Sequence, residues 1–113
     1  MQVEIETYAF LAAAKQAGMA EEERGHLISL LANDPTAGEV MVGTGGCRKV
    51  RFKKPGTGKS GGYRVVTYYG GGEIPLILLT VFGKNERANL DRAERNALKA
   101  LVARLDKELR NSQ

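Results

Sequence analysis

The chain has 113 residues, of which 42% are hydrophobic and 27% are charged, with a formal net charge of +4 at pH 7. This length and composition predict one globular domain over residues 1–113 and exclude a chain that is disordered throughout. The single cysteine excludes an internal disulfide, and no apolar run reaches the roughly 18 residues that span a bilayer, so we expect a cytoplasmic protein with no membrane partner.

The first third of the sequence predicts a short edge strand and two helices. The strand covers residues 2–5 and the first helix covers residues 7–16, ending before Gly18. The second helix, over residues 20–33, has three glutamates in its first turn and places Leu27, Leu30 and Leu31 on a common face. Asp34-Pro35 ends this helix.

The hydrophobic period changes to two after a loop over residues 36–46. In residues 47–54, Val50 and Phe52 face one way while lysines and an arginine face the other. Residues 63–69 are rich in β-branched and aromatic side chains, and three glycines then allow a reversal into residues 74–82. Because residues 74–82 are almost all apolar, we expect a central strand that is covered on both faces.

The last element is an amphipathic helix from Asp91 to about Leu109. Asp91 and Glu94 have the spacing of a capping box, and a leucine-rich stripe follows with a period of 3.6 residues. The element order predicts an α+β fold with an antiparallel sheet of three to four strands, two N-terminal helices and one C-terminal helix.

Basic residues are concentrated in one segment. Residues 47–64 hold seven of the 17 lysines and arginines and none of the 13 acids, so the remaining residues carry a net charge of −3 (+4 less seven). Strand parity places Lys49, Arg51 and Lys53 on one face, and Arg64 begins the neighbouring strand. The sequence therefore predicts a cationic groove for a polyanion, with nucleic acid as the first candidate.

Other catalytic motifs lack their structural context. The run from Gly56 to Ser60 has no glycine at the first phosphate-loop position and precedes a strand where that motif requires a helix. His26 is the only histidine and is expected on a helix surface, which excludes a two-histidine ribonuclease mechanism. Cys47 has no neighbouring histidine to activate it, and we expect no metal and no cofactor.

Two further groups of residues leave alternatives open. Tyr63, Tyr68 and Tyr69 either stack on RNA bases or belong to the core. Residues 83–87 are either a solvated connection or the edge of a site. If that segment is a site edge, the amine of Lys84 among other cations can act as an acid or base.

Three sequence blocks resemble a known family. Residues 43–51, 58–69 and 78–86, in this order before a C-terminal amphipathic helix, resemble the RelE/HigB-like toxins of bacterial type II toxin–antitoxin modules, most closely the HigB-type branch. The resemblance implies a microbial RNase fold with a curved antiparallel sheet. It also implies cleavage of mRNA in the ribosomal decoding site, without a metal, by attack of the ribose 2′-hydroxyl on the adjacent phosphate.

The resemblance also assigns roles to residues. Lys49 and Arg51 match the paired basic residues of the first site strand, and Arg64 matches the arginine that contacts the scissile phosphate. RelE has an arginine and a tyrosine in the final loop, and this chain has Asn85 and approximately Asp91 at those positions. The candidates for the base that removes the 2′-hydroxyl proton are therefore Lys49, Lys84 and Glu86. The predicted catalytic residues are Lys49, Arg51, Arg64 and Lys84, and the predicted RNA-binding residues are Arg48, Lys53, Lys54, Lys59, Tyr68 and Asn85.

Such a toxin implies partners. The resemblance predicts a cognate helix-turn-helix antitoxin, contact with operator DNA only through the antitoxin complex, and binding to the ribosome and mRNA. A non-catalytic nucleic-acid-binding or regulatory module derived from such a toxin is the alternative. A third hypothesis, an enzyme that binds the phosphate of a small molecule, has less support than the other two. The basic segment over residues 47–64 has neither a helix N-terminus to hold a phosphate nor an evident general base.

Overall fold

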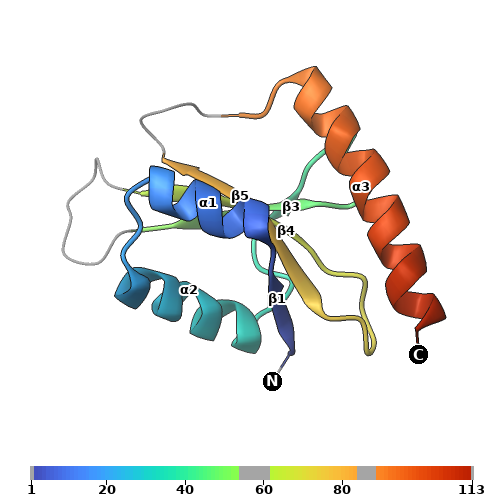
Figure 1. Ribbon diagram of the computed structural model, residues 1–113, viewed down its shortest axis with the longest axis horizontal. Helices are drawn as coiled ribbons and strands as arrows, with labels where there is room; N and C mark the ends of the chain where they lie inside the picture. Colours follow the sequence, from blue (N-terminus) through green and yellow to red (C-terminus); the bar gives the residue numbers. More distant parts are fainter. Residues whose placement is uncertain (1, 54–61, 84–88, 113) are drawn as a thin grey trace.

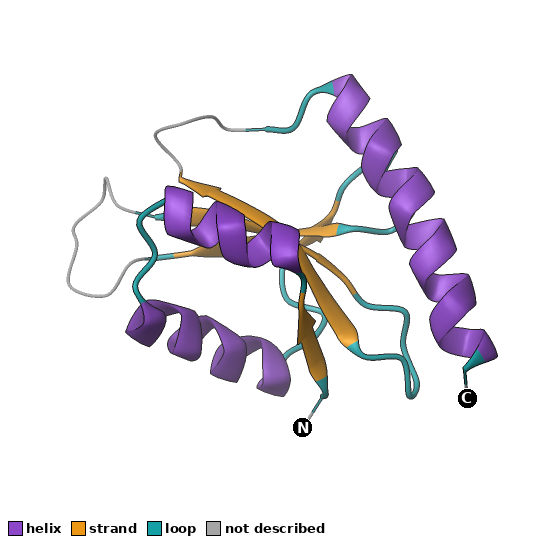
Figure 2. Ribbon diagram, viewed as in Figure 1, coloured by secondary structure: helices purple, strands orange, loops and turns teal. Residues whose placement is uncertain are grey.

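The computed structural model describes residues 2–53, 62–83 and 89–112, which form three helices and a five-stranded sheet (Figures 1 and 2). In chain order the elements are β1 (Glu4–Glu6), α1 (Tyr8–Gln16), α2 (Glu21–Asn33), β2 (Glu39–Val40), β3 (Arg48–Phe52), β4 (Tyr63–Tyr68), β5 (Leu76–Gly83) and α3 (Arg92–Asn111). This arrangement confirms the predicted α+β class.

The strands lie in the order β1-β5-β4-β3-β2. β3, β4 and β5 form the predicted antiparallel meander, and β1 pairs in parallel with β5 at one edge. β2 lies in the stretch that was predicted as a loop. It has only two residues, too few for an alternating pattern to reveal a strand.

Two cores lie on opposite faces of the sheet. α1 and α2 cover one face, where Phe10, Leu27 and Leu31 pack against side chains of β3, β4 and β5. α3 covers part of the other face, where Val102 packs against side chains that include Phe82. β5 contributes to both cores, which confirms the prediction of a central strand covered on both faces.

The prediction of the apolar face of α2 is only partly correct. Leu27 and Leu31 are fully buried, whereas Leu30 is 42% exposed. At 100° per residue, Leu30 lies at the margin of the stripe that is centred on Leu27 and Leu31. An apolar side chain is therefore left at the surface of α2.

Polar contacts fix α3 at both ends. The predicted capping box is present, with the Glu94 amide donating to Asp91 Oδ1 at 2.8 Å and the Asp91 amide donating to Glu94 Oε1 at 3.0 Å. Arg95 Nη1 also donates to the carbonyl of Val42 at 3.1 Å. The start of α3 is thereby held against the loop that precedes β3.

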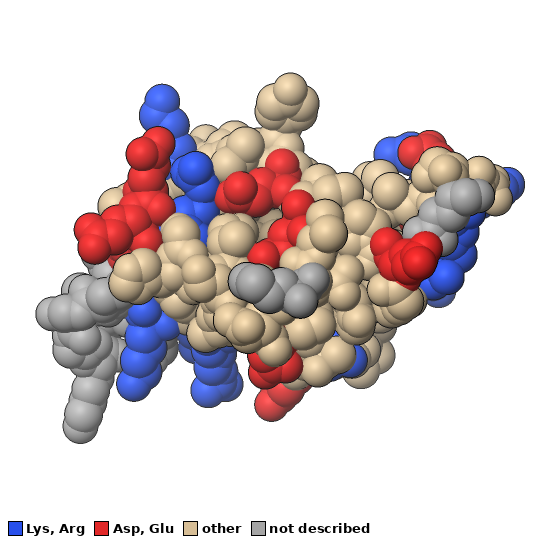
Figure 3. Space-filling view, turned by 90° about the horizontal axis from the view of Figure 1, so that it is seen from below, with Lys and Arg blue, Asp and Glu red and all other residues tan. Residues whose placement is uncertain are grey.

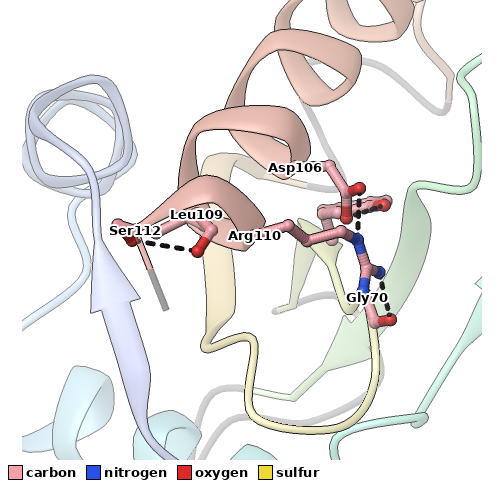
Figure 4. A network of polar contacts seen from close by, with 6 residues as sticks. Gly70, Asp106, Leu109, Arg110 and Ser112 are labelled. Carbon is pink, nitrogen blue, oxygen red and sulfur yellow. Dashed lines mark hydrogen bonds and ion pairs between the residues drawn. The ribbon is translucent and has the colours of Figure 1, made fainter.

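The last turns of α3 are tied to the β4–β5 connection (Figure 4). Arg110 donates from Nε to Asp106 Oδ2 at 2.7 Å and from Nη2 to the carbonyl of Gly70 at 3.0 Å. The hydroxyl of Tyr68 donates to Asp106 Oδ1 at 2.8 Å. A Cβ at Gly70 would lie 2.9 Å from Asp106 Oδ1, so a larger residue at this position would displace the Asp106 side chain.

Candidate functional site

The pairing of β3 with β4 brings three predicted site residues onto one face of the sheet. Arg51 pairs directly with Arg64, and Lys49, two residues along β3, pairs with Val66. Directly paired residues have Cα atoms about 5 Å apart, and side chains two residues apart on a strand are about 7 Å apart. We call Lys49, Arg51 and Arg64 the cation triad.

The cation triad lies on the face that α3 partly covers. Val66 and Phe82, which pair with Lys49 and Arg64, belong to the core beneath α3. Arg51 is exposed, while Lys49 and Arg64 are half-buried. The triad therefore lies where one end of this core meets solvent.

Like charges face each other within the triad. Among residues 2–53, 62–83 and 89–112, no ion pair joins Lys49, Arg51 or Arg64 to an acid. Two like charges directly opposite each other on neighbouring strands destabilise a sheet. An anion bound between the two arginines would relieve this repulsion, so the arrangement suits a phosphate.

Asn89 is a site residue that the sequence did not indicate. Lys49 Nζ donates to Asn89 Oδ1 at 2.8 Å, although the two residues are 40 positions apart. Asn89 lies in the segment that leads into α3, and no local pattern marks it as a contact of β3. This hydrogen bond holds the Lys49 amine in place on the sheet face.

The remaining predicted cations have varied positions. Arg48 has the opposite strand parity, and its Nη1 donates to the carbonyl of Thr36 at 3.2 Å. Lys53 is exposed just after the end of β3. Four predicted residues lie outside the described residues: Lys54, Lys59, Lys84 and Asn85.

Two of the three tyrosines are held away from the triad. Tyr68 packs against the core beneath α3, where burial and the hydrogen bond to Asp106 raise the pKa of its hydroxyl. Tyr63 is buried in the opposite core, and its hydroxyl lies 3.3 Å from both carboxylate oxygens of Glu23. The contacts of Tyr68 with α3 limit how its ring can meet RNA, and its predicted role in base stacking stays a prediction.

Cys47 and His26 have no arrangement for catalysis. Cys47 is fully buried, and burial raises the pKa of its thiol to about 11 despite the hydrogen bond to Thr44, so it does not supply a thiolate near neutral pH. His26 is exposed on α2, as predicted. Within the part of the chain that the structure describes, no three His, Cys, Asp or Glu side chains are grouped to hold a metal ion.

A cleft of about 450 Å³ opens beside the triad at the outer edge of β3. Its walls include Lys49 and Arg51 from β3, Leu30 from α2, and the loop that joins α2 to β2. We call this space the β3-edge cleft. It gives an incoming chain a second surface next to the cations.

Basic side chains gather locally on the surface. On the side of the molecule seen in Figure 3, two groups of basic side chains project along the lower left, while acidic and basic side chains are mixed over the upper left and at the right. β3 contributes basic side chains and no acid. Such a local group of cations attracts a polyanion.

No described helix is both long and apolar enough to cross a membrane. A family model matches residues 7–112, nearly the whole chain. That family is described as the RelE toxin of the RelE / RelB toxin-antitoxin system.

Proposed function

Because the chain belongs to the RelE toxin family and presents three cations on one face of its sheet, we propose that it is a ribosome-dependent mRNA endoribonuclease, the toxin of a toxin–antitoxin module. The single observation that carries the proposal is the cross-strand pairing of Arg51 with Arg64, beside Lys49. The narrower HigB-type assignment rests on the three sequence blocks.

Arg51 and Arg64 bind the scissile phosphate in this proposal. A guanidinium group presents planar paired donors that match two phosphate oxygens, and it stays charged at every physiological pH. When the 2′-oxygen attacks, phosphorus becomes pentacoordinate and gains negative charge. Two arginines already fixed on the sheet stabilise the pentacoordinate transition state more than they stabilise the ground state. Each such preorganised group contributes about 10²–10³-fold in rate.

The reaction also requires two proton transfers. The 2′-oxygen forms a bond to phosphorus while losing its proton, the bond from phosphorus to the 5′-oxygen breaks, and that oxygen gains a proton. The products are a 2′,3′-cyclic phosphate and a 5′-hydroxyl. Among the residues that the structure describes, Lys49, which Asn89 holds in place, is the candidate for one of these proton transfers. Lys84 and Glu86 remain candidates outside the described residues.

Further cations hold the RNA backbone. Lys53 continues the exposed row of β3, and we assign the same role to Lys54 and Lys59. Arg48 lies on the opposite face of the sheet, where it donates to the carbonyl of Thr36, so in this proposal it contacts only RNA that reaches that face. Each phosphate that these side chains neutralise releases counterions, so binding weakens with added salt.

The proposal includes the partners of a toxin–antitoxin module. The match to the RelE / RelB system supports an antitoxin, and we propose that it carries a helix-turn-helix that contacts operator DNA. The ribosome and mRNA place the protein in the cytoplasm. A non-catalytic module would share these partners but leave message intact.

Induced expression in a bacterial host tests the proposal. The wild-type chain should arrest growth, and mapping of 5′ ends should show cuts in translated message. Arg64→Ala should abolish both effects. Arg104→Ala removes one exposed arginine from α3 and should leave both effects intact. Folding of each variant is checked by circular dichroism. Intact message with the folded wild-type protein would contradict the proposal and favour the non-catalytic module.

A further inference from the structure

The first two turns of α3 carry three basic side chains on one side. Arg92, Arg95 and Lys99 follow one another at spacings of three and four residues, which places them on a common face of the helix. Arg92 and Lys99 are exposed, and no described acid forms an ion pair with any of the three. We call these side chains the α3 row. They are charges that the proposed chemistry does not use.

The loop that joins β2 to β3 lies against this face of α3. Arg95 Nη1 donates to the carbonyl of Val42 at 3.1 Å. Gly45 has a φ of +74°, and a Cβ there would lie 3.4 Å from Lys99 Cγ, so the loop backbone packs against the aliphatic part of Lys99. Residues 43–46 include three glycines and no charged side chain. The α3 row therefore borders a surface that a phosphate backbone can approach closely.

A hydrogen bond connects the α3 row to the cation triad. Lys49 Nζ donates to Asn89 Oδ1 at 2.8 Å, and Asn89 is three residues before Arg92. Three residues span at most about 11 Å, so the backbone of Arg92 lies within that distance of the residue that binds Lys49. From Arg92 to Lys99 the helix rises about 10 Å. The cations therefore continue from the sheet onto the helix without a wide gap.

The acids beside this path favour one direction for RNA. Glu39 is exposed and pairs with Lys49, so its carboxylate lies on the face of the triad at the outer edge of the sheet. A phosphate backbone that left the triad past this edge would meet a negative charge. Asp91 instead accepts the Glu94 amide within the capping box, where the start of the helix offsets its charge. The path over the α3 row is the one that cations line.

We propose that the α3 row binds the phosphate backbone of the message beyond the scissile step. One RNA strand would then run from the cation triad across Asn89 and along the start of α3. This inference rests on the proposed function, because it takes RNA at the triad as its starting point. Residues 42–46 and 89–99 contain no aromatic side chain that could stack on a base. The α3 row therefore adds affinity without base preference.

Binding of RNA that cannot be cut tests the proposal. The probes are fluorescently labelled oligoribonucleotides with 2′-O-methyl groups, one of four and one of twelve nucleotides. Affinity is measured by fluorescence anisotropy with the full chain. The shorter probe covers only the triad, whereas the longer probe also reaches α3. The longer probe should therefore bind at least about tenfold more tightly than the shorter one.

Protein variants locate the binding site. Arg92→Gln combined with Lys99→Gln should weaken binding of the longer probe about tenfold and leave the shorter probe within about twofold. For the longer probe, the slope of log affinity against log salt should shrink by about 1.4, since each phosphate contact of a single strand contributes about 0.7. The control combines Arg104→Gln with Lys107→Gln, which removes two exposed charges from later turns of α3 and should change neither affinity by more than about twofold. Circular dichroism checks the folding of both variants.

Several outcomes would overturn the proposal. These are unchanged binding of the longer probe by the α3-row variant, an equal loss for the two probes, and an equal loss in the control variant. Weaker binding of the α3-row variant to ribosomes without message, with unchanged affinity for the longer probe, would assign the row to ribosomal RNA instead. Probe binding as predicted by a protein that leaves mRNA uncut would refute the proposed function alone. Cleavage of mRNA by a protein whose α3-row variant binds the longer probe unchanged would refute this inference alone.

Discussion

Replacing one arginine of the cross-strand pair should stabilise the protein while removing its activity. Arg51 and Arg64 are direct partners in the pairing of β3 with β4, and no described acid forms an ion pair with either of them. Like charges in this position destabilise a sheet by about 0.2–1 kcal/mol. The other contact of Arg64, from Nη1 to the carbonyl of Tyr63, is 3.5 Å long and contributes little.

We therefore expect Arg51→Gln and Arg64→Gln each to raise the free energy of unfolding by about 0.5 kcal/mol in low salt. The double variant should gain little more than either single variant, because the first substitution already removes the repulsion. Added salt should shrink the gain, since it screens the repulsion in the wild-type protein. Cleavage by each single variant should fall by about 10²–10³-fold.

Urea denaturation at low and high salt measures the stability, and cleavage of ribosome-bound mRNA measures the activity. Arg104→Gln, which removes an exposed charge from α3, should change neither by a comparable amount. A loss of more than about 1 kcal/mol in either single variant would show that the arginines support the sheet. That result would refute the interpretation of the pair as a preformed anion site.

Three other substitutions test the described contacts. Tyr68→Phe should lower the free energy of unfolding by about 1–2 kcal/mol, because it leaves Asp106 without its hydroxyl donor, and cleavage of mRNA by the folded variant should be unchanged. Gly38→Ala should cost about 1–3 kcal/mol in urea denaturation through its contact with Lys49, and more than Gly43→Ala, which shares a positive φ but meets no atom within 4 Å. Burial and the charge of Glu6 raise the pKa of the Glu4 carboxyl to about 7, above its usual 4.5, so the wild-type protein should lose stability as the pH rises between these values. Glu4→Gln should abolish this loss, and a stability difference between the two proteins that stays constant from pH 4 to pH 8 would contradict the pKa assignment.

Strongly periodic segments were predictable from the sequence. β3 alternates over five residues and α3 carries a stripe over its length, so both elements and their buried faces followed from side-chain spacing. The register between β3 and β4 was not predictable, because it depends on the connection of residues 53–62. The sequence therefore indicated the cations but not the direct pairing of Arg51 with Arg64.

Contacts between distant segments were the features that the sequence missed. Tyr68 lies on the same face of β4 as Arg64, but strand parity does not show which part of a face a helix covers. The contact of Asn89 with Lys49 joins a loop to a strand, and no spacing rule relates two such positions. The β3-edge cleft also depends on tertiary packing, since α2 and the following loop form its walls.

The central claim is that the cation triad promotes attack by a ribose 2′-hydroxyl on mRNA held in the ribosome. The most direct measurement exposes purified ribosomes, programmed with a defined message, to the purified protein and analyses the ends of the RNA products. We predict cuts that leave a 2′,3′-cyclic phosphate, and no cut where the nucleotide on the 5′ side of the scissile phosphate is replaced by its 2′-deoxy form. Uncut ribose message, or equal cutting of the 2′-deoxy message, would contradict the account.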